Sequence, residues 1–148
     1  MEFTGRQMVI NGYIKINDNF KTMELKEYQN QAMTTCMPSS ENFSYMFLNL
    51  IGEVGEFASK VSKQIRKSNM NIEDSQLAFT TKADINNLDC FYEELQKEAG
   101  DILWQLSGLC TVMGWSLEDI AQINLDKLAS RKAMGTIDGN GDGIIRGK

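Results

Sequence analysis

Two pairs of acidic residues are the side chains in this sequence best suited to metal chemistry. Glu53-Val-Gly-Glu56 and Glu98-Ala-Gly-Asp101 each place two carboxylates three residues apart, which puts both on one face of a helix. If the two faces turned toward each other, four carboxylates would repel unless a cation lay between them. Oxygen ligands favour a hard ion, so we expect Mg²⁺, or alternatively Mn²⁺, before Zn²⁺. Such a site suggests phosphate chemistry.

Either acidic pair alone is more commonly the solvated face of a surface helix. Two features favour a functional role here. A glycine, Gly55 or Gly100, precedes the second acid of each pair. Glycine costs roughly 0.5–1 kcal/mol inside a helix, so its use suggests that another backbone or a ligand comes close. Glu94 precedes Glu98 by four residues, so a third carboxylate shares the second face.

The helices that must carry these pairs follow from the spacing of apolar residues. We predict an all-α bundle of about four helices, with limits near 22 or 23 to 36, 42 to 66, 87 to 112, and 116 to 133. Ser39 or Ser40 is the predicted N-cap of the second helix and Ser116 that of the last. The apolar stripe of the second helix excludes both acids and comprises Phe43, Phe47, Leu50 or Ile51, Val54, Ala58, Val61 and Ile65.

The segments outside these helices are less regular. Residues 1–22 form an N-terminal extension, in which residues 8–16 carry a short β-hairpin signal around Asn-Gly. Residues 67–86 are predicted to be a loop with a short helical turn. Residues 135–148 form a tail rich in Gly and Asp, which leaves residues 23–134 as one helical domain.

The composition excludes several classes of function. The chain has 148 residues, 42% of them hydrophobic, and a net charge of −5. The length suits one domain with a core, and a protein without a basic surface is not expected to bind polymeric DNA or RNA. An acidic protein can still bind a nucleotide when metal ions mediate the contact. The absence of His excludes His-based triads and proton shuttles.

The cysteines and the apolar runs bear on the cellular compartment. Cys36, Cys90 and Cys110 are odd in number and lack metal-ligand spacing, so we expect free thiols in a reducing compartment. The first twenty residues have no signal-peptide pattern, and no apolar run approaches the ~18 residues of a membrane span. We therefore expect a cytoplasmic protein with no membrane partner.

Three motifs in this order resemble the MazG-like group of all-α nucleoside triphosphate pyrophosphohydrolases. The resemblance covers roughly residues 23–142 and rests on Leu50-Ile-Gly-Glu53-Val-Gly-Glu56, Glu98-Ala-Gly-Asp101-Ile-Leu-Trp104 and Asn124-Leu-Asp-Lys127-Leu-Ala-Ser-Arg131. It implies that Glu53, Glu56, Glu98 and Asp101 bind Mg²⁺. Many members carry a further Glu where this chain has Gly52, so the site is expected to hold fewer ions or to hold them more weakly.

The resemblance also implies a reaction. Water attacks the α-phosphorus of a nucleoside triphosphate, which gives the monophosphate and pyrophosphate. Without His, the base must be a carboxylate or a hydroxide held by the metal, and Glu56 is our candidate catalytic residue. Metal and positioning would supply most of the rate enhancement.

Cations are expected beside the phosphates. The resemblance assigns Lys127 and Arg131 to phosphate binding and Asn124 to the sugar or base, although a solvated helix face would show the same residues. Lys60, Lys63, Arg66 and Lys67 more simply form a solvated helix end. Phe43, Phe47 and Trp104 could stack on a base, but helical spacing favours core packing for each.

Three further hypotheses complete the set. The resemblance implies a homodimer or homotetramer whose sites borrow residues from a neighbouring subunit. A related activity, on phosphoribosylated nucleotides, is one alternative. The other is a non-catalytic helical interaction module, with calcium bound at residues 138–145, which resemble half of an EF-hand loop but lack its final Glu.

Overall fold

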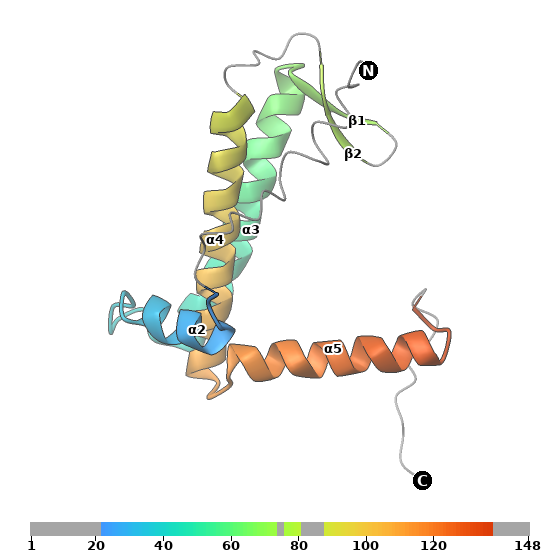
Figure 1. Cartoon of the computed structure of the whole chain (residues 1–148). Coiled ribbons are helices and arrows are strands. Elements are labelled where there is room, and N and C mark those ends of the chain that lie inside the picture. Colours follow the sequence, from blue (N-terminus) through green and yellow to red (C-terminus); the bar gives the residue numbers. More distant parts are fainter. Residues whose placement is uncertain (1–21, 74–75, 81–87, 138–148) are drawn as a thin grey trace.

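A computed structural model of the chain describes residues 22–73, 76–80 and 88–137 (Figure 1). Within these ranges the protein is all-α, as the sequence predicts, with one small antiparallel hairpin. The elements are α2 (Leu25–Met33), α3 (Phe43–Arg66), β1 (Met70–Glu73), β2 (Gln76–Phe79), α4 (Leu88–Val112) and α5 (Leu117–Ala133). Figure 1 shows α3 and α4 side by side, with α2 across one end of the pair and α5 extending away.

The helix limits agree with the sequence except at α2 and at one cap. The three long helices begin and end within one residue of the predicted limits, whereas α2 is shorter than predicted. The serine cap predicted for α3 is wrong, because the side chain of Asn42 accepts the hydrogen bond from Tyr45 N, at 2.9 Å. Ser116 caps α5 as predicted, accepting from Asp119 N at 3.4 Å.

Two predicted features lie outside the described residues. These are the hairpin at residues 8–16 and the EF-hand-like tail at residues 138–145. The division of the chain at residues 22 and 134 stays a prediction. None of the described helices combines the length and apolar character needed to cross a membrane.

The seam between α3 and α4 is the main packing contact of the described chain. At one end of the seam, the fully buried Met46 of α3 packs against Gly108 of α4. A Cβ built at Gly108 would overlap the sulfur of Met46 and lie 3.3 Å from its Cγ. Glycine at this position therefore lets the two helices come close.

The hairpin closes the other end of the seam. Met70, Phe91 and Leu95 are buried there, with Phe57, Val61, Leu77 and Phe79 packed around them. The ring of Phe79 meets the ring of Phe91 edge-on, with centroids 6.1 Å apart. The prediction of a loop with a helical turn was wrong for residues 70–73 and 76–79, which pair from Met70↔Phe79 to Glu73↔Gln76. Two four-residue strands gain their stability from packing on the helices rather than from local propensity.

One glutamine joins the opposite end of the fold. Gln29 of α2 is 8% exposed, and its Nε2 donates to Thr111 Oγ1 at 2.9 Å and to Trp115 O at 3.0 Å. Its Oε1 accepts a hydrogen bond at 2.7 Å from the backbone N of Leu117, which is the first residue of α5. This side chain therefore binds both sides of the turn between α4 and α5 and fixes the direction in which α5 leaves.

The aromatic candidates divide into two environments. Trp104 is half-buried, and its Nε1 donates to Ala32 O and Thr35 Oγ1, so it ties α4 to the end of α2. Phe43 and Phe47 are not in the core of the described chain, because they are 52% and 44% exposed. Their rings stack on each other with centroids 5.6 Å apart.

The predicted apolar stripe of α3 is largely open to solvent. Ile51 is 56% exposed and Val54 51% exposed. The residues that face α4 are centred on another side of the helix and are spaced by seven, four and four: Met46, Glu53, Phe57 and Val61. Of these, only Val61 belongs to the predicted stripe. The helix therefore has two apolar faces, and α4 covers only one of them.

We predict opposite stability effects for two Gly→Ala substitutions in α4. Gly108→Ala should lower the free energy of unfolding by roughly 1–2 kcal/mol, because overpacking against Met46 outweighs the gain in helix propensity. Gly100→Ala should raise it by about 0.5–1 kcal/mol, because no described atom lies within 4 Å of the new methyl group. Urea unfolding followed by circular dichroism measures both, and equal effects would contradict the close approach at Gly108.

Candidate metal centre

Three of the four predicted carboxylates converge on one point between α3 and α4. Oxygen atoms of Glu53, Glu56 and Glu98 all lie within 4.8 Å of one another. The first two share a face of α3, and the third comes from the antiparallel α4. Asp101 is exposed and does not belong to this group, but its charge acts on Glu53.

The three carboxylates differ in their exposure to water. Glu98 is 8% exposed, Glu53 is half-buried and Glu56 is exposed. Burial raises the pKa of Glu53 above the ordinary glutamate value, and the charges of Glu56, Asp101 and Glu98 raise it further. The charged form of Glu53 is therefore unfavourable in the folded chain, and a nearby cation would stabilise it.

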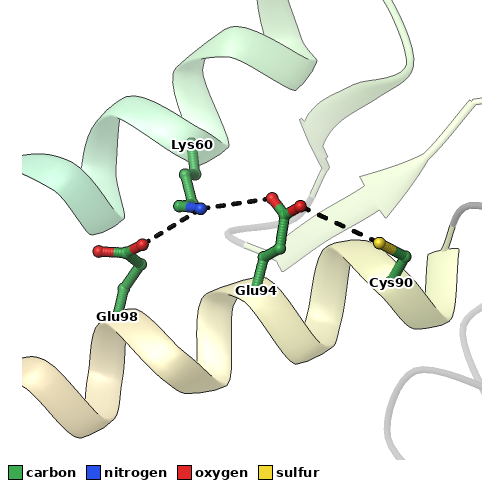
Figure 2. Close-up of polar contacts among 4 residues, drawn as sticks. All are labelled: Lys60, Cys90, Glu94 and Glu98. Carbon is green, nitrogen blue, oxygen red and sulfur yellow. Dashed lines mark hydrogen bonds and ion pairs between the residues drawn. The ribbon is translucent and has the colours of Figure 1, made fainter.

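One cation already lies beside the cluster. Lys60 Nζ is 3.1 Å from Glu98 Oε1 and 3.3 Å from Glu94 Oε2 (Figure 2). The hydrogen bond to Glu98 is the largest cause that raises the pKa of Lys60. The prediction of solvated side chains is confirmed for Lys63, Arg66 and Lys67, which are exposed. Lys60 is instead partly buried and ion-paired across the seam. Its position seven residues after Glu53, on the same helix face, was the available signal.

The donor set fits a hard divalent ion. The cluster offers carboxylate oxygens alone, which suit Mg²⁺ or Mn²⁺. The thiol of Cys90 makes only a weak contact of 4.0 Å with Glu94 Oε1 (Figure 2) and lies outside the carboxylate group. Position 52 is an exposed glycine, and because glycine has no side chain, α3 provides no additional carboxylate there.

The glycines of the two motifs face open space. No described atom lies within 4 Å of a Cβ built at Gly55 or at Gly100. The backbone approach that these glycines suggested does not come from the described part of this chain. The space beside them remains available to a ligand or a second copy.

The predicted substrate residues lie on a different arm of the molecule. Asn124 and Lys127 are exposed on α5, and Arg131 is half-buried near its end. Figure 1 shows α5 leaving the α3–α4 pair at one end and extending away from it. One chain therefore does not bring these residues to the carboxylates.

Comparisons with known proteins show the family of the chain. The family described as the MazG nucleotide pyrophosphohydrolase domain matches residues 41–135. The chain is also 35% identical over 104 residues to the Gene 37 protein of Mycobacterium phage L5. The aligned segment covers 70% of this chain and 78% of the phage protein. No solved structure matches the chain.

We predict that Glu53→Gln stabilises the metal-free protein at neutral pH. Because the pKa of Glu53 is higher in the folded state than in the unfolded state, the protonated side chain favours folding relative to the charged one. This favourable contribution is present below the unfolded-state pKa and is lost as pH rises through the folded-state pKa. In chelator at pH 7.5 the substitution should raise Tm by roughly 2–4 °C, and this gain should shrink as pH falls toward about 4.3.

Glu93→Gln is the matched control, because Glu93 is exposed on α4 and no ion pair is recorded for it among the described residues. Its Tm should equal that of the parent. A lower Tm for Glu53→Gln in chelator at pH 7.5 would contradict the unfavourable position of that charge.

Proposed function

The chain belongs to the MazG nucleotide pyrophosphohydrolase family, and from this premise we propose that it is a Mg²⁺-dependent nucleoside triphosphate pyrophosphohydrolase. The proposed reaction converts an NTP or dNTP to the monophosphate and pyrophosphate. The observation that carries the proposal is the convergence of three carboxylates within 4.8 Å, in a segment that the family matches. Oxygen ligands from two helices suit a cation that binds a triphosphate.

Each carboxylate has a separate role in this proposal. Glu53 and Glu98, the less exposed pair, would hold the metal. Asp101 lies outside the group of three but acts on Glu53, and it would add a ligand from the next turn of α4. When bound, the metal neutralises phosphate oxygens and makes the α-phosphorus easier to attack. Glu56 is exposed at the edge of the cluster, where it can orient a water molecule and accept its proton. The water oxygen bonds to the α-phosphorus, and the bond to the pyrophosphate oxygen breaks.

The phosphate-binding cations come from a second copy in this proposal. In a homodimer or homotetramer, α5 of one subunit would bring Asn124, Lys127 and Arg131 to the carboxylates of its neighbour. Two features support this arrangement. First, α5 extends away from its own chain's cluster (Figure 1). Second, large apolar side chains are exposed on α3 and α5, which is typical of an interaction surface. They are Phe43, Phe47, Leu48, Ile51, Val54, Ile123, Leu125 and Leu128.

We predict that the protein releases pyrophosphate from at least one member of a panel of NTPs and dNTPs with Mg²⁺, and not with chelator. Glu53→Gln and Asp101→Asn should each lower kcat/KM by about 100-fold or more, because each removes a ligand charge. Coupled pyrophosphate detection measures the rates. Glu93→Gln is the control and should keep the parent rate.

The panel should also contain phosphoribosylated nucleotides. Hydrolysis of these compounds alone would replace the proposed substrate with the biosynthetic alternative. Release of no pyrophosphate from any nucleotide, by a folded protein with Mg²⁺, would contradict the enzyme proposal.

A mixing experiment tests the shared site. Glu53→Gln and Lys127→Ala should each be inactive alone, whereas co-refolded mixtures should regain about a quarter of the parent activity. The reason is that half of random dimers are mixed, and each mixed dimer contains one intact site. The measurement is pyrophosphate release alongside size-exclusion chromatography. A monomer, or a mixture no more active than its components, would contradict the shared site.

A further inference from the structure

We propose that Lys60 is a resident cation of the carboxylate cluster, which competes with the metal ion for Glu98, and that Glu94 tunes this competition by offering Lys60 a second partner. The inference deepens the proposed function and rests on its metal site. It concerns the affinity of that site for the divalent ion rather than the chemical step.

The geometry places one ammonium between two carboxylates of α4. Lys60 leaves α3 one turn after Glu56 and crosses the seam. Its Nζ lies 3.1 Å from Glu98 Oε1 and 3.3 Å from Glu94 Oε2, so the two contacts are nearly equal in length (Figure 2). Glu94 and Glu98 are one helical turn apart on the same face, so a small rotation of Lys60 shifts it from one carboxylate to the other.

The exposure of the three side chains sets the direction of the effect. The side chain of Glu98 is 11% exposed, that of Lys60 32% and that of Glu94 49%. Without a metal ion, Glu98 has most to lose if it is unpaired, because a nearly buried charge needs a partner. Lys60 supplies this partner from inside the fold.

A divalent ion changes the balance at Glu98. The ion and the ammonium carry like charges and need the same carboxylate, so each weakens the binding of the other. Glu94 removes part of this conflict, because Lys60 can keep an ion pair with the more exposed carboxylate while Glu98 turns to the metal. Lys60 therefore lowers metal affinity, and Glu94 restores part of it.

Mn²⁺ binding to the full-length protein tests the inference, with the free ion followed by electron paramagnetic resonance. Lys60→Met should tighten the Kd for Mn²⁺ by roughly three- to tenfold, because it removes the competing charge. The same variant should have a lower Tm in chelator, because Glu98 loses its partner. Glu94→Gln should weaken the Kd by roughly threefold or more, because Lys60 then rests on Glu98 alone.

A double-mutant cycle separates this competition from simple loss of charge. Glu94→Gln in the Lys60→Met background should change the Kd no more than Glu93→Gln does, because Glu94 acts through Lys60. Lys60→Arg should keep the parent Kd within about twofold. Lys63→Met removes an exposed charge from the next turn of α3 and should also leave the Kd within about twofold.

Several results would overturn the inference. One is a Kd for Mn²⁺ that Lys60→Met weakens or leaves unchanged. Another is an equal tightening by Lys63→Met. If Lys60→Met does not fold, an unchanged or tighter Kd in Glu94→Gln overturns it equally. A role in folding alone would not tighten metal binding, so the direction of the change in Kd is the distinguishing measurement.

The failure of this inference is distinguishable from failure of the proposed function. If Mn²⁺ binds with the expected cycle but no nucleotide releases pyrophosphate, the enzyme proposal fails and the role of Lys60 stands. If hydrolysis is metal-dependent but the Lys60 and Glu94 variants bind Mn²⁺ as the parent does, the role of Lys60 fails alone.

Discussion

The half-buried Glu53 and the nearly buried Glu98 lie in the seam between α3 and α4. The rest of the structure depends on how the seam accommodates their negative charges. Apolar contacts hold the seam closed on either side of the acids. On one side Met46 packs against Gly108, and on the other the hairpin covers Phe91. These contacts prevent α3 and α4 from moving apart, which would otherwise reduce the repulsion between the two carboxylates. The fold therefore keeps this repulsion, which a nearby cation or protonation of Glu53 relieves.

The same constraint explains why a lysine lies in the site. If the cluster binds a metal as proposed, it must also fold before the metal arrives, and a nearly buried Glu98 without a partner would oppose folding. Lys60 provides that partner in the chain as described, and in our proposal it then competes with the metal. Exposed ion pairs contribute little to stability, so the contact with Glu98, rather than that with Glu94, carries the stabilising effect.

The sequence predicts the helices well because their limits depend on local signals, namely apolar spacing, caps and Gly114 at the end of α4. Spacing places Glu53 and Glu56 on one face of α3, but only the packing of α3 on α4 brings Glu98 to them. Their role as metal ligands stays a prediction. The paired strands at residues 70–73 and 76–79 could not be predicted, because they depend on packing against α4. Spacing puts Lys60 on the same face of α3 as Glu53, but its ion pair with Glu98 also depends on contacts across the seam. Nor can apolar spacing say which of two apolar faces of α3 turns inward.

The direction of α5 is the clearest case of a feature that no local pattern contains. It depends on Gln29, whose contacts reach Thr111, Trp115 and Leu117, more than eighty residues along the chain. These buried hydrogen bonds resist rotation of α5 toward its own α3, because a broken bond would leave Leu117 N without its acceptor. The arm that carries Lys127 therefore stays away from its own carboxylates. The proposed binding of phosphates by Lys127 therefore requires the carboxylates of another copy of the chain.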